Sequence, residues 1–164
     1  MTARIIAGTG HRPADLPKSF GYSFESEAWR EVIEDIKNVL KKEAITGVIS
    51  GMALGFDQAL AIATLELQDE GVQIDLYAFC PCKGQETLWK ESSIELYNKI
   101  LARCKQVFYI QPTYTSGCML ERNIAMLECC DLLIAFYNGK NTGGTFHCIT
   151  NAQERGIKII NLYK

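Results

Sequence analysis

The chain has 164 residues, of which 48% are hydrophobic and 22% charged, and its formal net charge is -2. This length and composition are ordinary for a soluble protein with one core, so we expect residues 1–164 to form a single domain. Acidic residues outnumber basic ones by 19 to 17, which argues against a nucleic-acid partner and leaves only a local basic patch open. Because we find no apolar signal region at the amino terminus and no stretch long enough to span a bilayer, we expect a cytoplasmic protein with no membrane partner.

Short apolar runs and longer amphipathic segments alternate along the whole chain. Buried apolar runs predict strands, and apolar residues three or four positions apart predict helices. The expected strands cover residues 4–9, 47–49, 74–80, 106–110, 132–137 and 158–162, with Pro81 ending the third. The expected helices cover about 27–42, 57–71, 92–104, 119–129 and 145–155. This alternation predicts an α/β fold, a Rossmann-like doubly wound three-layer sandwich with a mainly parallel sheet.

Three glycine-rich turns, at residues 8–12, 50–57 and 138–145, each follow a predicted strand. The carboxyl ends of parallel strands lie at one edge of the sheet, where ligands bind at a switch in strand order. Glycine permits close approach, and the free N–H groups that begin a helix attract anions. We therefore expect the three turns to converge on one pocket for a phosphate or ribose. For turn 50–57 alone the alternative is a plain connection in which Asp57 only caps its helix.

Two arginines lie beside these turns. Arg122 is near the amino-terminal turn of its helix, where a cation is unfavourable for the helix, so phosphate binding would account for it. Asn123 beside it is suited to an amide or a base edge, and Arg12 follows the first glycine turn. For Arg122 the alternative is a solvated surface residue, and Arg12 favours the same phosphate interpretation.

The remaining polar and aromatic residues carry weaker signals. The two histidines, His11 and His147, are isolated in the sequence. His11 is either an acid or base or a residue with local hydrogen bonds, and we expect His147 to be structural. Trp89 and Tyr114 lie in predicted loops near the same edge, where they either stack on a base or pack in the core or at the rim.

Seven cysteines without a secretion signal indicate reduced thiols. Cys80 and Cys82 have the spacing of half a zinc site, but no second Cys or His pair stands at usable spacing, so we predict no metal. The glycines at 8 and 10 lack the third glycine of the dinucleotide fingerprint, and Gly139-Lys140 lacks the preceding glycine of a P-loop. We therefore expect neither a kinase nor a conventional dehydrogenase, and no cofactor.

Several short motifs occur together in a recognisable order. They are Gly8-Thr9-Gly10-His11-Arg12-Pro13, Ser50-Gly51-Met52-Ala53-Leu54-Gly55-Phe56-Asp57, Pro81 with Gln85 and Trp89, Glu121-Arg122-Asn123 with Met126, Cys130-Asp131, and Thr142-Gly143-Gly144-Thr145. In this order they resemble the YpsA-like branch of the SLOG superfamily, which is named for the DNA-processing protein DprA (Smf) and the LOG nucleotide phosphoribohydrolases. The resemblance covers nearly the whole chain and implies a Rossmann-like fold with a nucleotide pocket.

The resemblance to LOG enzymes, which cleave the N-glycosidic bond of nucleoside monophosphates, is incomplete. Arg122 resembles their Arg, but Gly144-Thr145 leads to Cys148 where their motif has a Glu. Cleavage needs a carboxylate to stabilise the oxocarbenium ion or activate water, so the catalytic candidates are Asp57 and Glu121. The resemblance to DprA is confined mainly to turn 50–57.

Together these observations predict that the protein binds a nucleotide or a nucleotide-derived metabolite, with an ADP-ribose or NAD-related signal as one candidate, as a sensor or sequestering protein. The alternatives are a nucleoside 5'-monophosphate N-glycoside hydrolase with a non-standard carboxylate, and an interaction module with a vestigial pocket. By analogy with related folds a homo-oligomer stays open. The expected ligand-binding residues are Gly8, Thr9, Gly10, Arg12, Ser50, Gly51, Gly55, Asp57, Arg122, Asn123, Thr142, Gly143, Gly144 and Thr145.

Overall fold

A six-stranded sheet forms the middle layer of the protein in the computed structural model, which describes residues 2–164. The strand order is β4-β3-β2-β1-β5-β6, and all five strand pairings among residues 2–164 are parallel. The strands are β1 (Ile5–Gly10), β2 (Gly47–Ser50), β3 (Asp75–Cys82), β4 (Gln106–Gln111), β5 (Leu132–Phe136) and β6 (Lys158–Asn161). The predicted Rossmann-like α/β fold is therefore confirmed.

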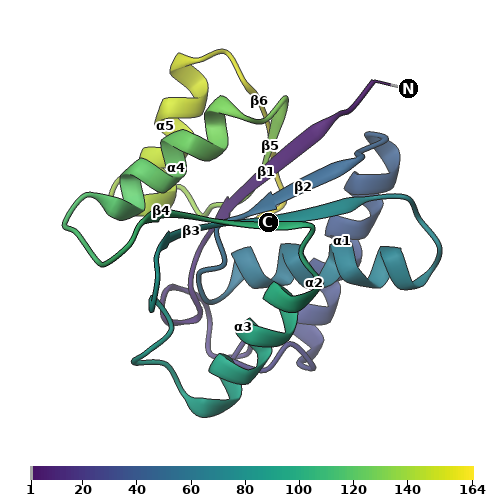
Figure 1. The fold of residues 1–164 in the computed structure, drawn as a ribbon. Helices are drawn as coiled ribbons and strands as arrows, with labels where there is room; N and C mark the ends of the chain where they lie inside the picture. The colour runs from purple at the N-terminus through teal and green to yellow at the C-terminus, as the bar shows by residue number, and fades with distance from the viewer. Residues whose placement is uncertain (1) are drawn as a thin grey trace.

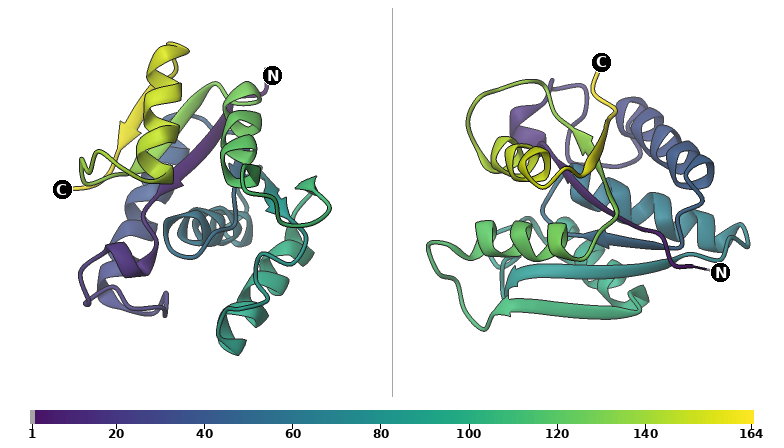
Figure 2. Two further views of the ribbon diagram at one scale, coloured as in Figure 1. Left: turned by 90° about the vertical axis from the view of Figure 1, so that its left-hand side faces the viewer. Right: turned by 90° about the horizontal axis from the view of Figure 1, so that it is seen from above.

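Five α-helices cover the two faces of this sheet. They are α1 (Glu27–Lys42), α2 (Phe56–Asp69), α3 (Glu91–Arg103), α4 (Cys118–Glu128) and α5 (Gly144–Glu154). The first three lie on one face, and α4 and α5 lie together on the other (Figure 1), an arrangement that Figure 2 shows from two further sides. Strands β1 to β4 are added in one direction across the sheet, whereas β5 and β6 are added on the other side of β1. Right-handed crossovers that run in opposite directions place their helices on opposite faces, so the helices after β4 lie on the second face.

The core follows from the apolar patterns of the sequence. All five residues of β5 are buried, as expected for a strand that is covered on both faces. Helix α1 is capped by Ser26, whose hydroxyl accepts the Trp29 N–H at 3.3 Å, and it buries an apolar stripe that includes Trp29, Ile33 and Leu40. The observed helix ends agree with the predicted ones within about two residues.

The expectation that Pro81 ends the third strand is wrong. Strand β3 continues through Pro81 to Cys82, and Cys82 still pairs with Gln111 of β4. The pairing with β2 has already ended at Ser50 and Ala78. Beyond that point β3 has a neighbour on one side only, so a residue without an N–H is tolerated there.

The long loop after β1 is more ordered than the sequence indicates. A short 3-10 helix (Pro13–Asp15) follows β1 directly. The later part of the loop packs on α1, where the Trp29 indole donates to the Gly21 carbonyl at 3.0 Å and stacks edge-on with Phe20 at 4.9 Å between ring centres. The later part of the loop is therefore held against α1.

The helices of the structure can be compared with the length and apolar character of a membrane-spanning helix. Within residues 2–164, none of the helices combines the length and the apolar character that crossing a bilayer requires.

Candidate functional site

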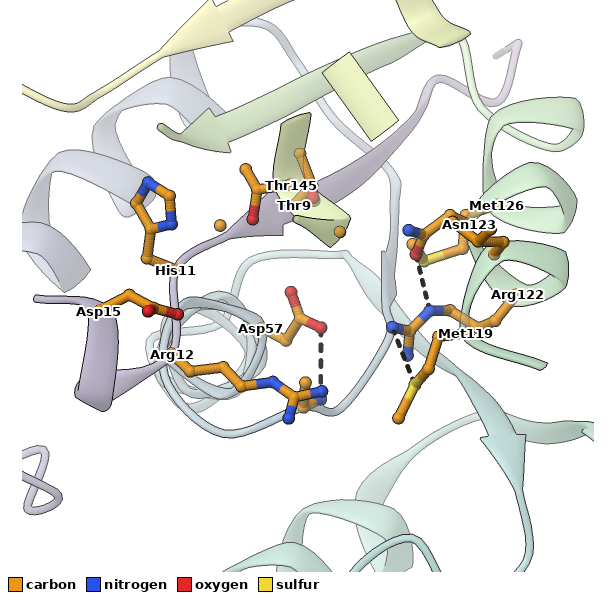
Figure 3. A pocket seen from close by; sticks show the side chains of 15 residues that line it. Thr9, His11, Arg12, Asp15, Asp57, Met119, Arg122, Asn123, Met126 and Thr145 are labelled. Atoms are coloured by element: carbon orange, nitrogen blue, oxygen red, sulfur yellow. Dashed lines mark hydrogen bonds between the residues drawn. The ribbon is translucent and has the colours of Figure 1, made fainter. Parts of the chain in front are cut away.

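A pocket of about 340 Å³ lies where β1 meets β5, the point at which the strand order reverses. Its walls come from the turn after β1, the turn before α2, helix α4 and the start of α5 (Figure 3). The lining residues are Gly8, Thr9, Gly10, His11, Arg12, Asp15, Ala53, Asp57, Met119, Leu120, Arg122, Asn123, Met126, Gly144 and Thr145. Nine of the fourteen residues expected from the sequence are thus on its walls.

The floor of the pocket is the glycine-rich end of β1. A Cβ at Gly10 would lie 2.5 Å from the Cβ and Cγ of Phe56, and one at Gly8 would lie 2.3 Å from Leu60 Cδ2. Phe56 cannot give way easily, because it is fully buried and its ring stacks on Phe136 at 5.7 Å. These glycines let α2 pack directly against the strand and bring its amino terminus to the pocket.

Several polar groups of the turn between β2 and α2 form hydrogen bonds with one another. The Ser50 hydroxyl donates to the Asp57 carbonyl at 2.7 Å and accepts the Met52 N–H at 3.1 Å. The Ala53 N–H donates to Asp57 Oδ2 at 3.2 Å, so Asp57 holds the turn before α2, but its side chain does not cap the helix. Ser50 is therefore a structural residue, and this turn offers fewer free amides than the sequence suggests.

The two glycines of this turn also lie outside the pocket walls and have structural reasons to be there. Gly55 has a φ of 89°, and a Cβ on it would lie 2.5 Å from the His11 carbonyl oxygen. A Cβ on Gly51 would lie 2.6 Å from Arg122 Nη1 and 2.9 Å from Asp57 Oδ2. The absent side chain at Gly51 is what lets the guanidinium and the carboxylate come near each other.

Arg122 is buried in the wall of the pocket, with 5% of its surface exposed. Its Nη1 donates to the Gly51 carbonyl at 2.6 Å and its Nε donates to Asn123 Oδ1 at 2.9 Å, while Nη2 has only the weak Met119 sulfur at 3.9 Å. Within residues 2–164 no carboxylate comes within salt-bridge distance of Arg122. A buried guanidinium with spare donors is a good partner for an anion.

Asp57 lies between the two arginines of the pocket (Figure 3) and is itself buried. Burial raises the pKa of its carboxyl, while the charge of Arg122, the Ala53 amide and the charge of Arg12 oppose that rise. Arg12 is exposed, and across the described residues 2–164 it has no ion pair. The centre of the pocket therefore holds one acceptor flanked by two guanidinium groups that are not neutralised at close range.

The start of α5 contributes free backbone donors. The helix begins after Gly143, whose φ is 96°, and no side chain caps it. The N–H groups of Gly144, Thr145 and Phe146 have no hydrogen-bond acceptor among residues 2–164, and Gly144 and Thr145 line the pocket. Gly143 and Thr142 are exposed and do not line it. This helix terminus is an anion-attracting element on the wall opposite α2.

Three other sequence candidates lie elsewhere. Glu121 is outside the pocket walls, and its Oε2 accepts from Gln111 Nε2 at 2.8 Å. Trp89 packs edge-on against Tyr97 at 5.3 Å, and Tyr114 is exposed away from the pocket. The apolar wall consists instead of Met119, Leu120 and Met126 on α4. Their helical spacing is visible in the sequence, but it is indistinguishable there from an ordinary core stripe.

Two further pocket residues were not among the ligand-binding residues expected from the sequence, although His11 belongs to turn 8–12. His11 is buried and accepts the Asn138 N–H on Nε2 at 3.0 Å, and Asp15 of the 3-10 helix stands beside it (Figure 3). Burial lowers the pKa of His11, which favours the neutral ring, while the Asn138 side chain and the charge of Asp15 oppose that fall. The glycine turn that precedes His11 was the available signal.

The Cys-Pro-Cys segment is part of the core. Cys80 and Cys82 are both buried, and the Cys80 sulfur lies 3.3 Å from the Tyr97 hydroxyl. Throughout residues 2–164, no three His, Cys, Asp or Glu side chains gather closely enough to hold a metal ion.

Comparison with known proteins gives the family. The sequence model YpsA, described as the YspA SLOG family, matches residues 6–161. The chain belongs to this family. A UPF0398 protein of Bacillus cereus is 28% identical over 162 residues, which cover 93% of this chain and 84% of that relative.

Solved structures show the same SLOG fold at low sequence identity. DNA processing protein A from Helicobacter pylori, whose structure is described for its single-stranded DNA binding mode, superposes with a TM-score of 0.68 at 17% identity, covering 99% of this chain and 66% of that one. DNA processing protein A (DprA) from Streptococcus pneumoniae superposes with a TM-score of 0.64 at 16% identity, covering 97% of this chain. The present chain spans half the length of the Streptococcus protein. At these identities the likeness shows a common fold.

The position of the LOG glutamate is occupied here by a cysteine. Cys148, at the position where that motif has a Glu, is fully buried on α5 beside the Thr9 hydroxyl. Burial raises the pKa of its thiol to about 11, so the group is uncharged. Cys148 is not on the pocket walls and offers no carboxylate there.

Proposed function

We propose that this protein binds a phosphorylated, ribose-bearing small molecule, a nucleotide or nucleotide-derived metabolite, in the pocket between β1 and β5. Its role would be that of a sensor or a sequestering protein, and an ADP-ribose or NAD-related compound is the candidate we would test first. The observation that carries the proposal is that Arg12 and Arg122 line one pocket without a salt-bridge partner among residues 2–164. Cations held in this way favour an anionic ligand.

The remaining walls support a ligand with more than one kind of group. The free amides of Gly144 and Thr145 suit a second phosphate or carboxylate. Asp57 would accept a hydrogen bond from a sugar hydroxyl. Its carboxyl group is a hydrogen-bond acceptor, which suits a hydroxyl but not a phosphate oxygen. The apolar wall of Met119 and Met126 suits a base. A volume of about 340 Å³ is within the range of small-ligand pockets.

Binding can be tested by calorimetry with 5'-AMP, ADP-ribose and inorganic phosphate, after native mass spectrometry has looked for a co-purified molecule. Arg12→Ala should weaken the nucleotides about tenfold to a hundredfold, because a charge-assisted contact is lost while no internal contact is disturbed. Arg155→Ala is the matched control, since Arg155 is also exposed and lies away from the pocket. Equal affinities in the two variants, or no binding to the wild type, would contradict the proposal.

The hydrolase alternative rests on Asp57, because Glu121 is turned to Gln111 and Cys148 replaces the expected Glu. It predicts release of free base from nucleoside monophosphates, and loss of that release in Asp57→Asn. Tight binding without any release of base favours the sensor.

Single-stranded DNA is the second alternative, and the likeness to the Helicobacter DNA processing protein weakens the earlier argument from net charge. Fluorescence anisotropy with a labelled oligonucleotide tests it. Binding that 5'-AMP fails to displace would place DNA outside the pocket and count against the nucleotide proposal as the main function.

A homo-oligomer, which the sequence leaves open, stays a prediction. Its support is a set of large apolar side chains that are partly exposed on β4 and α4, namely Phe108, Tyr109, Leu120 and Ile124. Light scattering behind a sizing column would measure the mass directly.

A further inference from the structure

His11 is the point at which the three segments around the pocket meet. Its backbone N–H donates to the Phe136 carbonyl at 3.3 Å, and its carbonyl accepts the Phe56 N–H at 3.2 Å. Its ring nitrogen Nε2 accepts the Asn138 N–H at 3.0 Å. One residue therefore links the end of β1 to the start of α2 and to the segment that leads into α5.

The contact with Asn138 fixes the proton on the ring. A nitrogen that accepts an N–H cannot carry a hydrogen itself, so neutral His11 carries its proton on Nδ1. The lowered pKa agrees with this neutral form. Nδ1–H has no acceptor among residues 2–164, although the residue is only 6% exposed. In Figure 3 the ring lies on the pocket wall.

The surroundings of the ring indicate which ligand group it meets. Asp15 stands on the same wall, and its charge acts on the His11 ring. A carboxylate repels phosphate, whereas a donor next to an acceptor matches a hydroxyl, which both accepts and donates. Arg122 and the α5 terminus lie on other walls, and the Arg12 side chain extends from the turn of His11 toward Asp57 (Figure 3). This end of the pocket therefore suits the hydroxyl groups of a sugar.

The segment that His11 holds is otherwise lightly anchored. Residues 138–143 are all exposed. Their side-chain contacts are local, such as Tyr137 Oη donating to the Lys140 carbonyl at 2.6 Å and Lys140 N–H donating to Asn138 Oδ1 at 3.0 Å. The Asn138–His11 bond is thus the long-range tie of this segment to the pocket.

We propose that His11 donates a hydrogen bond from Nδ1–H to a sugar hydroxyl of the ligand. Because Nε2 of the same ring accepts the Asn138 N–H, ligand binding is coupled to the conformation of residues 138–143. This rests on the proposed function, because it names which part of that ligand this wall binds. A bound hydroxyl fixes the ring orientation and so strengthens the bond to Asn138. Ligand binding then orders the segment that leads into α5.

Two substitutions separate the two ring nitrogens. His11→Asn keeps a donor near the position of Nδ1 and removes the acceptor at Nε2, while His11→Gln keeps an acceptor near Nε2 and removes the donor at Nδ1. The probes are 5'-AMP, which carries a ribose, and inorganic phosphate, which does not. Affinity is measured by calorimetry, and hydrogen exchange of the amides of residues 138–143 is measured with and without 5'-AMP.

For the wild type we expect 5'-AMP to slow exchange in residues 138–143. His11→Gln should weaken 5'-AMP about three- to tenfold and leave phosphate within about twofold, since one neutral hydrogen bond is lost. His11→Asn should retain most of the 5'-AMP affinity but lose the slowing of exchange. Unchanged 5'-AMP affinity in His11→Gln, or undiminished slowing in His11→Asn, would overturn the inference.

The inference can also be tested on the wild-type protein, so that the result does not depend on whether the variants fold. Nitrogen-15 NMR of the imidazoles should show Nδ1 as the protonated nitrogen of His11, and 5'-AMP should shift that resonance while phosphate does not. A proton on Nε2, or no shift with 5'-AMP, counts against the inference. Failure of 5'-AMP to bind the wild type at all would instead sink the proposed function, and this inference with it.

Discussion

Arg122 Nη1 donates a 2.6 Å hydrogen bond to the carbonyl oxygen of Gly51, which ties α4 on one face of the sheet to the turn that leads into α2 on the other. The bond passes over the end of β2, and both groups are buried. The Arg122 guanidinium thus stabilises the contact between these two segments, and it is also a buried cation on the pocket wall that can bind an anionic ligand. Substitutions at this position should affect stability and binding together.

Arg122→Met keeps the length of the side chain but removes every donor. We expect a loss of about 1–3 kcal/mol of unfolding free energy at pH 7, because the Gly51 carbonyl and Asn123 Oδ1 are left buried without their partner. The pKa of Asp57 should rise further, since the charge of Arg122 is the largest influence that opposes its rise. Urea unfolding and an NMR titration of Asp57 measure both effects, with Arg155→Met as the exposed control; an unchanged Asp57 titration would show that the two groups do not interact.

Gly10→Ala should destabilise the protein by about 1–3 kcal/mol, because the new methyl group overlaps Phe56, which Phe136 holds from behind. Gly144→Ala is the matched control, since a Cβ there meets nothing within 4 Å and the residue begins a helix. We expect a change within about 0.5 kcal/mol for this variant. Thermal and urea unfolding compare the two, and similar losses in both would show that close packing is not what Gly10 provides.

Asp57→Asn tests the buried carboxyl through pH. The folded pKa lies above the ordinary value of 3.8, so the native state binds the proton more tightly than the unfolded chain does. The stability that this provides is present at low pH and is lost as pH rises through the folded pKa. The variant should therefore gain stability relative to wild type between pH 4 and pH 7. Glu154→Gln, at an exposed position, is the control, and a constant difference across this range would contradict the prediction.

His11 predicts a pH effect in the opposite direction. Its folded pKa lies below 6.5, so the stability that neutral His11 provides is complete above pH 6.5 and is lost as pH falls through the folded value. Protonation would place an N–H on Nε2 facing the Asn138 N–H, while Asp15 and Lys140 act on the ring with opposite signs. Denaturation at pH 7.5 and 5.5 should show a smaller loss in His11→Asn than in the exposed control His147→Gln. Equal losses would exclude His11 as the source.

Most of the fold was predictable because its signals are local. The apolar run of β5 and the amphipathic stripe of α1 each determine an element, and their alternation determines the layers. Pro81 was misread because its effect depends on where the neighbouring strand β2 stops, which is information about pairing between distant residues.

The site was predictable only in part, for a related reason. The glycine turns marked the correct edge of the sheet, and Arg12, Asp57 and Arg122 do line the pocket. Ser50 and Gly51 turned out to be structural, because their contacts join residues 7 and 71 positions apart in the chain. His11 was underestimated because its partner, Asn138, is 127 residues away.

The exposed position of residues 138–143 has a consequence for how proteins of this fold can diversify. No side chain of this segment belongs to the core, yet it leads directly into a pocket wall. Loops of this kind tolerate changes of length at little energetic expense. Insertions or deletions in residues 138–143 would change which ligands bind without disturbing the sheet. This segment is therefore the best place to engineer a new ligand specificity.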